Sequence, residues 1–164
     1  MTQLFAEDTV YISEQQDQKS VFKEIAQKLF EKGLVTEEYL DNLIDREENY
    51  PTALPLSPID SSLPNIAIPH TESQFVNVTR IVPVKLEHAI TFHNMILPDE
   101  KLEVSFLFMI LNNEEKEQAG LLAAIMDFIN RQDKEALIKF FNSENTERIY
   151  QFLKNNFSSV WSRG

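Results

Sequence analysis

The stretch from Glu103 to Leu111 reads EVSFLFMIL, and its last six residues are all apolar. An apolar run without polar alternation is typical of a strand that is covered on both faces. A sheet with helices on each side provides that environment. We therefore expect Glu103–Leu111 to be the central strand of a helix-flanked sheet.

Three more short strands are predicted from runs of β-branched and aromatic residues. They are residues 9–12 (TVYI), 65–68 (NIAI) and 80–86 (RIVPVKL). Pro83 in the last of them indicates an edge strand or a bulge, because proline cannot donate to the ladder. Between residues 50 and 64, four prolines predict turns and extended pieces.

Apolar residues at helical spacing predict helices before and after these strands. The first is capped by Asp17 or Ser20 and stops at Gly33, and the second begins at Thr36 as its N-cap. Behind the central strand we expect a helix from about Lys116 to Asn130, a short helix after Asp133, and a last one with Ser143 as candidate cap. The prediction is one α/β domain over residues 1–157 with a mixed parallel and antiparallel sheet, followed by a frayed tail over 158–164.

Composition excludes several classes of protein and site. The 164 residues include no Cys, so disulfides, thiol nucleophiles and Cys-based metal sites are excluded. Three glycines are too few for a glycine-rich phosphate loop. A net charge of −11 argues against nucleic acid and anionic lipid as partners and favours a basic protein. With no signal peptide and no span-length apolar run, we expect a cytoplasmic protein without membrane insertion.

The segment 66–71, IAIPHT, places His70 at the end of an apolar strand and directly behind a proline. Strand ends in open α/β sheets commonly carry ligand chemistry. A neutral imidazole there is a nucleophile, a general base or a metal ligand. The alternative is a surface histidine in a turn.

From Leu4 to about Asn156 the chain resembles the EIIA domain of the sugar phosphotransferase system, in its mannitol/fructose superfamily. The matching pieces are residues 43–47 (LIDRE), Pro51-Thr52 and residues 66–73 (IAIPHTES). The ending His-Thr-Glu-Ser is more similar to the galactitol-type branch than to the mannitol or fructose proteins, which usually have Gly after the histidine. The resemblance implies the EIIA mannitol/fructose-like fold and a phosphotransferase component.

By this resemblance, His70 is the phosphorylated residue. It would accept the group from the phosphocarrier protein HPr and pass it to a cysteine of the EIIB partner, for galactitol or a related sugar. No cofactor and no metal is implied, since the phosphoryl group moves directly between proteins. A regulatory phosphoprotein outside transport and a non-catalytic interaction module are the alternatives.

Three residues are predicted to stabilise the phosphoryl group. Arg46 matches the family arginine near the active histidine; the alternative is a surface arginine paired with Glu47 or Glu48. Thr52 matches a family position from which its hydroxyl would donate; the alternative is a turn residue. Gln118 stands where mannitol and fructose proteins carry a second histidine, and its amide can donate but not titrate; the alternative is an exposed glutamine.

The two other histidines, His88 and His93, occupy a hairpin-like segment. A zinc site of three histidines is conceivable, but their spacing is not helical, so we interpret both as solvent-facing or structural. The charge run of Glu114, Glu115 and Glu117 is typical of a solvated face; the alternative is that Glu114, Glu115 or Glu72 helps a basic partner to dock.

Overall fold

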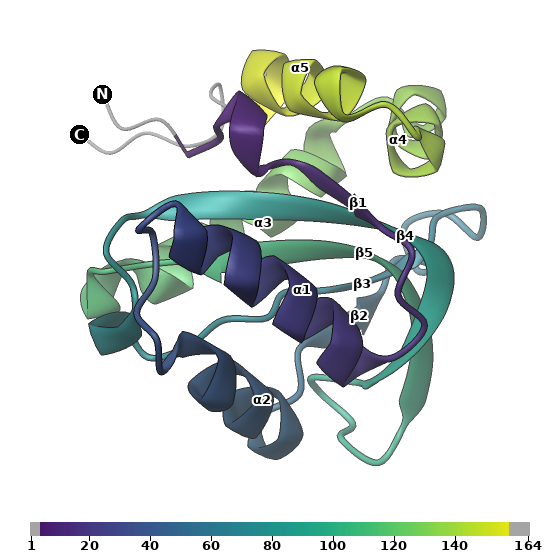
Figure 1. Cartoon of the computed structure of the whole chain (residues 1–164). Coiled ribbons are helices and arrows are strands. Elements are labelled where there is room, and N and C mark those ends of the chain that lie inside the picture. Colours follow the sequence, from purple (N-terminus) through teal and green to yellow (C-terminus); the bar gives the residue numbers. More distant parts are fainter. Residues whose placement is uncertain (1–3, 158–164) are drawn as a thin grey trace.

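The chain folds as three layers, with a five-stranded sheet between two groups of helices (Figure 1). This computed structural model describes residues 4–157. The strands are β1 (Tyr11–Ser13), β2 (Ala53–Pro55), β3 (Asn65–Ala67), β4 (Arg80–His93) and β5 (Lys101–Leu111). The helices are α1 (Gln18–Glu31), α2 (Tyr39–Asn49), α3 (Gln118–Arg131), α4 (Lys134–Asn142) and α5 (Thr146–Phe157), with short 3-10 turns at Glu7–Thr9, Ser73–Phe75 and Glu115–Glu117.

The sheet has the strand order β1-β4-β5-β3-β2 and is mixed. β1 runs parallel to β4 and β3 runs parallel to β5, whereas the β4–β5 and β2–β3 pairs are antiparallel. The predicted α/β class and mixed sheet are therefore confirmed. β5 lies at the centre of the order, as its apolar sequence predicts.

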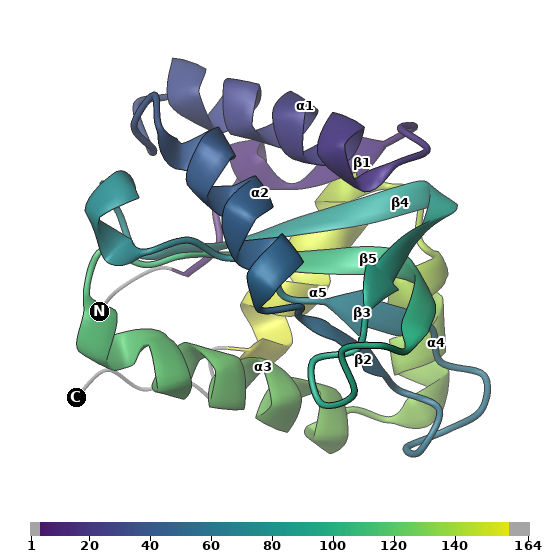
Figure 2. The same cartoon turned by 90° about the horizontal axis from the view of Figure 1, so that it is seen from below.

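Alternate residues of β5 serve two separate cores. Phe106, Phe108 and Ile110 pack with residues of α3, α4 and α5, while Leu107 and Leu111 pack with residues of α1 and α2. Figure 2 shows α1 and α2 on one side of the sheet and α3 on the other. Both faces of the central strand are thus buried, which explains why its sequence shows no polar alternation.

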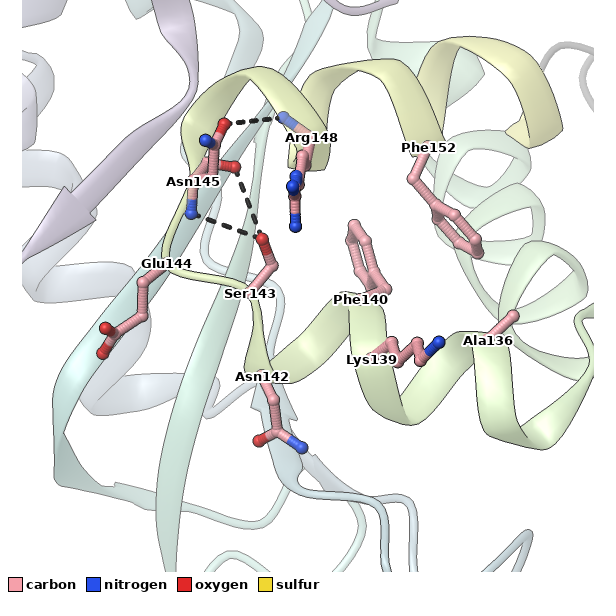
Figure 3. A pocket seen from close by; sticks show the side chains of 9 residues that line it. All are labelled: Ala136, Lys139, Phe140, Asn142, Ser143, Glu144, Asn145, Arg148 and Phe152. Atoms are coloured by element: carbon pink, nitrogen blue, oxygen red, sulfur yellow. Dashed lines mark hydrogen bonds between the residues drawn. The ribbon is translucent and has the colours of Figure 1, made fainter.

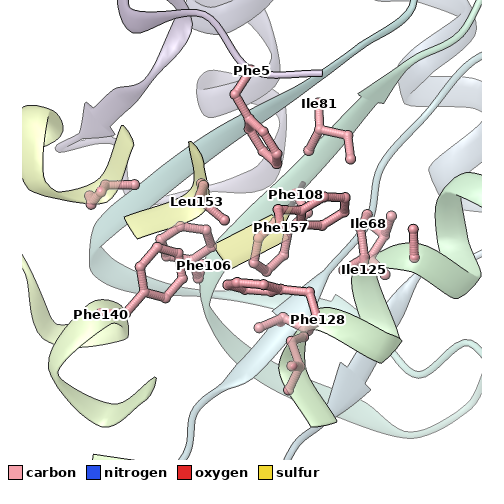
Figure 4. Close-up of a cluster of buried hydrophobic side chains, with 14 of the residues drawn as sticks. Phe5, Ile68, Ile81, Phe106, Phe108, Ile125, Phe128, Phe140, Leu153 and Phe157 are labelled. Carbon is pink, nitrogen blue, oxygen red and sulfur yellow. The ribbon is translucent and has the colours of Figure 1, made fainter. Parts of the chain in front are cut away.

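The first core is rich in phenylalanine. Side chains from the sheet, α3, α4 and α5 converge there, and Phe5 from the N-terminal segment completes the cluster (Figure 4). Phe106 lies 4.9 Å from Phe108 and 5.3 Å from Phe140 between ring centroids. Tilted and edge-on ring pairs at such distances add to the burial of apolar area.

Two predicted caps are wrong. The second helix begins at Tyr39 and not at Thr36, whose carbonyl instead closes a turn by accepting from the Tyr39 N–H. The last helix is capped by Asn145, whose side chain accepts from the Arg148 N–H, while Ser143 only binds the Asn145 backbone. By contrast, Asp17 caps α1 and Gly33 adopts a φ of 73°, both as predicted.

The strand that begins at Arg80 is longer than predicted and continues to His93. Its ladder with β5 shifts register between Lys85 and Ile90, so the second half is a continuation after a bulge and not a separate hairpin. β4 is not an edge strand overall, but β1 pairs with it only from Val84 onward. Pro83 therefore lies just outside that pairing, where a missing N–H is tolerated.

Candidate functional site

His70 follows β3 through Ile68 and Pro69 and lies beyond the carboxyl end of β3, on the side where the parallel strand β5 also ends. It forms a parallel bridge with Ile110 near the end of β5, where the Ile110 N–H donates to the Pro69 carbonyl at 3.0 Å. The Nδ1 atom of the ring lies 2.9 Å from the Ile68 carbonyl oxygen. The histidine is thus held on both its backbone and its ring, while its side chain is only partly buried.

The hydrogen bond to Ile68 determines the tautomer of His70. A carbonyl oxygen only accepts, so Nδ1 carries the proton and Nε2 keeps a free lone pair. Burial lowers the pKa of His70 below its ordinary value of 6.5, the Ile68 hydrogen bond opposes this, and the positive charge of Arg46 lowers it further. The ring is therefore neutral near pH 7, with Nε2 available as a nucleophile or base.

Arg46 lies on α2, and its charge acts on His70. Its guanidinium carbon lies 4.9 Å from the ring centroid of Tyr50, one turn further along the chain, which is a cation–π contact. Its Nε atom is buried and has no hydrogen-bond partner within residues 4–157. Among residues 4–157, neither Glu47 nor Glu48 forms an ion pair with Arg46. The structure therefore does not contain the alternative arrangement, a surface arginine paired with one of these two glutamates.

Thr52 is buried and makes contacts that sequence reasoning did not predict. Its hydroxyl donates to Oε1 of Glu47 at 2.8 Å, and its N–H donates to Oε2 of the same carboxylate at 2.7 Å. A hydroxyl has only one proton, so Thr52 donates to Glu47 and not towards a group on His70. Its predicted role as a phosphoryl donor therefore does not match this geometry.

Thr52 is also joined to the strand that carries His70. The Ile68 N–H is shared between the Thr52 hydroxyl oxygen at 3.2 Å and the Thr52 carbonyl oxygen at 3.3 Å. Ile68 in turn accepts from the imidazole of His70. A continuous series of hydrogen bonds therefore runs from Glu47 through Thr52 and Ile68 to His70.

Gln118 is the first residue of α3, which follows β5 at the same end of the sheet. Its Oε1 accepts from the side chain of Asn112 at 3.1 Å, and its buried Nε2 has no partner in the part of the chain that the structure describes. Asn112 itself comes two residues after Ile110, the bridge partner of His70. The structure therefore places an unpaired amide donor and a helix N-terminus near the strand end that carries the histidine.

The other histidines do not join this site. His88 is exposed on β4, and the ring of His93 bonds to the Pro98 carbonyl at 2.7 Å. Within residues 4–157, no three His, Asp or Glu side chains gather as a metal site would require. In the same part of the chain, no helix is long and apolar enough to cross a membrane.

A separate hollow lies between α4 and α5, away from these residues. It has a volume of about 870 Å³, and Phe140 and Phe152 are among its lining side chains. In Figure 3 the side chain of Arg148 points toward this opening from α5. It shares no residue with the His70 site.

Sequence reasoning missed two residues of the site, Glu47 and Tyr50. Glu47 is only 5% exposed, although it stands among acidic residues at the end of a helix. Burial raises its pKa to about 7, against the two hydrogen bonds from Thr52. The sequence pointed to Glu47 only in that it is the last residue of LIDRE, which forms part of the family resemblance. The charged residues around Glu47 favoured a solvated position instead.

A comparison with protein families matches a family model to residues 3–156. The matching model is the family described as phosphoenolpyruvate-dependent sugar phosphotransferase system, EIIA 2. The chain belongs to this EIIA family. EIIA domains carry phosphoryl groups as phosphotransferase components, so the family is one of phosphoryl carriers. No curated protein matches the sequence.

Solved structures of this kind share the fold at low sequence identity. A protein described as a candidate PTS IIA (PtxA) from Streptococcus mutans superposes with a TM-score of 0.71 at 20% identity, over 96% of this chain and 94% of that one. The mannitol enzyme IIA of Escherichia coli, in a complex with phosphorylated enzyme IIB, gives 0.67 at 18%, over 93% and 98%. The nitrogen regulatory protein IIA-Ntr of Neisseria meningitidis gives 0.61 at 17%, over 92% and 96%. The expectation of an EIIA mannitol-like fold is confirmed.

Proposed function

We propose that this EIIA protein accepts a phosphoryl group on Nε2 of His70 from phosphorylated HPr and passes it to a cysteine of an EIIB partner. The observation that carries the proposal is the hydrogen bond between Nδ1 and the Ile68 carbonyl. It leaves Nε2 unprotonated on a partly exposed, neutral ring. A neutral nucleophile at the protein surface is what transfer between two proteins requires.

Each transfer is a simple displacement at phosphorus. In the first step the Nε2 lone pair forms an N–P bond while the N–P bond of the donor breaks, and the donor nitrogen keeps the electron pair. In the second step a cysteine thiolate of the acceptor forms an S–P bond, and the electron pair of the breaking N–P bond returns to Nε2. Nδ1 keeps its proton throughout, so no further base is needed.

The charge on phosphorus must be stabilised during both steps. A phosphoryl group brings about −1.5 to −2 charges and three acceptor oxygens. Arg46 offers a cation with a buried Nε that has no other partner, and Gln118 offers an unpaired amide at the start of α3. Both donors are fixed before phosphate arrives, which is the arrangement that lowers a barrier most.

Partners and sugar class follow from the family and from residues near His70. The mannitol enzyme IIA forms a complex with phosphorylated enzyme IIB, and we extend this kind of pairing to the present chain. The exposed carboxylates of Glu72, Glu114 and Glu115, on a chain with net charge −11, suit basic docking surfaces. The IPHTES sequence and Gln118 favour a galactitol-type system.

Phosphorylation by labelled phospho-HPr tests the assignment. Wild type should be labelled, and ³¹P NMR should identify Nε2 as the bonded atom. The His70→Ala variant should take up no label, while His88→Ala and His93→Ala should behave as wild type. Label on His70→Ala, or label mapped to His88 or His93, would overturn the assignment.

The sugar class is tested separately with phosphorylated protein. We expect rapid transfer to a galactitol-type EIIB and slow transfer to a mannitol-type EIIB. The opposite order would overturn the galactitol assignment alone. Efficient labelling without transfer to any EIIB would favour the regulatory alternative, and no labelling at all would favour an interaction module.

A further inference from the structure

Glu47 is the carboxylate at which the series of hydrogen bonds that reaches His70 begins. It lies on α2 beside Arg46, yet its side chain is turned into the protein and is 5% exposed. Both oxygens are engaged by Thr52, through the N–H and the hydroxyl. Burying a carboxylate is costly unless hydrogen bonds replace its lost hydration, and here Thr52 donates to both oxygens.

We propose that Glu47, in its ionised form, is a positioning residue for His70, acting through Thr52 and Ile68. The inference rests on the proposed function, because it concerns the same imidazole. The carboxylate fixes Thr52, Thr52 fixes the Ile68 N–H with two oxygens, and the Ile68 carbonyl fixes Nδ1–H. This is how an unprotonated Nε2 is kept in place.

Protonation of Glu47 weakens this arrangement because both hydrogen bonds from Thr52 go to its carboxylate. Hydrogen bonds to an ionised acceptor are roughly twice as strong as those to a neutral acceptor. A protonated carboxyl can still accept on both oxygens, but it has lost the negative charge that strengthens the two bonds. The contacts that fix Thr52 are therefore weaker when Glu47 is protonated.

Several charged or titratable groups lie around the same opening as Glu47. They line a cavity of about 530 Å³ that also contains Glu47, and they come from four elements. Lys19 lies on α1, Glu48 on α2, His93 at the end of β4 and Asp99 in the loop before β5. This cavity gives protons a route to the carboxyl group that does not pass through His70.

The pH dependence of phosphoryl transfer should therefore have two separate components. Burial raises the pKa of Glu47 to about 7, whereas burial lowers that of His70 below 6.5. As pH falls, Glu47 takes up its proton first and loosens the imidazole, and His70 itself is protonated at lower pH. The rate of transfer from phospho-HPr should thus decrease in two steps.

The first test compares Glu47→Gln with Glu48→Gln, a matched control at the exposed neighbour. Glutamine has the shape of the protonated carboxyl and should imitate it. Glu47→Gln should transfer about 10–100-fold more slowly than wild type at pH 8, as expected for a displaced reacting group. Its step near pH 7 should be absent, while Glu48→Gln should keep both rate and profile. A wild-type rate with an unaltered profile in Glu47→Gln overturns the proposal.

The second test uses ¹⁵N NMR of the His70 ring and needs no phosphoryl transfer. Wild type at pH 8 should show protonated Nδ1 and unprotonated Nε2, and Glu47→Gln should shift toward a mixture of tautomers. Unchanged ring shifts in Glu47→Gln overturn the proposal even if His70 is phosphorylated. If the His70 ring of wild type shows the expected tautomer but is not labelled by phospho-HPr, the proposed function is overturned and the positioning role of Glu47 is not.

Thr52 provides an independent pair of variants if Glu47→Gln does not fold. Thr52→Val removes the hydroxyl at constant shape and should reproduce the loss of rate and the ring shifts, whereas Thr52→Ser should restore both. If both single variants fold, the double variant with Glu47→Gln should be no slower than the slower single one, because both act through one connection. Losses that multiply, or a Thr52→Val variant with wild-type rate and ring shifts, overturn the proposal.

Discussion

At the scale of single residues, Arg46 is held ready for an anion before any anion is bound. Its guanidinium rests on Tyr50, its Nε has no protein acceptor, and its charge already acts on His70. We expect Arg46→Ala to slow transfer from phospho-HPr by about 10²–10³-fold, the usual cost of one preorganised donor. Arg46→Lys should recover only part, because an ammonium lacks the planar fork. Rapid-quench kinetics measures both.

The matched control for this prediction is Arg148→Ala. Arg148 lines the hollow between α4 and α5 (Figure 3). Its replacement by alanine removes the same charge as Arg46→Ala, but away from the His70 site. Its rate should equal that of wild type at a given ionic strength. If Arg46→Ala and Arg148→Ala slowed transfer from phospho-HPr equally, Arg46 would act only through the net charge of the protein.

The residues of the site differ in how far sequence predicts them. His70 stands out locally, since a proline and an apolar strand precede it. Glu47 does not, because its neighbours on the helix are charged and only the return of the chain through Thr52 buries it. Whether the Thr52 hydroxyl faces a phosphoryl group or a carboxylate is likewise decided by tertiary contacts. Residue type indicated the chemistry, and packing determined the direction of each donor.

At the scale of elements, the start of α3 provides the anion site with a dipole as well as a side chain. Gln118 is its first residue, and although the Gln118 N–H already donates to the Glu115 carbonyl, the start of the helix carries partial positive charge. We therefore expect Gln118→Ala to slow transfer only about two- to tenfold, the worth of one neutral hydrogen bond. The same phospho-HPr assay measures it.

A second variant at this position tests whether the helix start lies near the phosphoryl group. Gln118→His adds a titrating ring beside the proposed anion site, so the pH profile of transfer should gain an ionisation between about pH 5 and 8. If neither Gln118→Ala nor Gln118→His changed the rate of transfer or its pH profile, the start of α3 would not lie near the phosphoryl group.

Elements were predictable where one residue pattern fixes them. The apolar run of β5 is a local signal, and so is the start of α1, where the sequence offers Asp17 or Ser20 as the cap and the structure has Asp17. β2 was predicted only as part of an extended region, because its three residues become a strand by pairing with β3 across a long loop. The continuation of β4 to His93 depends on β5 as its partner, and no local pattern shows where a bulge ends and pairing resumes.

At the scale of the whole molecule, stability depends on two cores that share one sheet. Phe106 is fully buried in the core that faces α4, with rings of Phe108, Phe140 and Phe141 around it. Phe106→Ala should lower the free energy of unfolding by about 3–5 kcal/mol through lost burial and a cavity. Urea denaturation measures this as a lower midpoint at unchanged slope.

The control for the core is Phe30, which is 45% exposed on α1. Phe30→Ala should change the free energy of unfolding by no more than about 0.5 kcal/mol, as is usual for surface positions. A similar loss in both variants would mean that the packing around Phe106 adds nothing beyond the removal of apolar area.

The titration of Glu47 should also make the free energy of unfolding of the whole protein depend on pH. Burial raises the pKa of this carboxyl from 4.5 to about 7, so between these values the folded protein binds a proton that the unfolded chain has released. The free energy of unfolding therefore falls as pH rises through this window, and the loss is complete above about pH 7. A shift of this size corresponds to about 3 kcal/mol.

Glu47→Gln removes this contribution, and the His70 titration acts in the opposite direction. The lowered pKa of His70 makes the protein lose stability as pH falls below 6.5. Urea denaturation at intervals from pH 4.5 to 8 should give a difference, variant minus wild type, that increases with pH by up to about 3 kcal/mol. Glu48→Gln should give a difference that stays flat. If the difference in free energy of unfolding between Glu47→Gln and wild type did not change with pH, the Glu47 carboxyl would ionise in the folded protein as it does in water. Keeping Glu47 ionised would then cost the fold no stability.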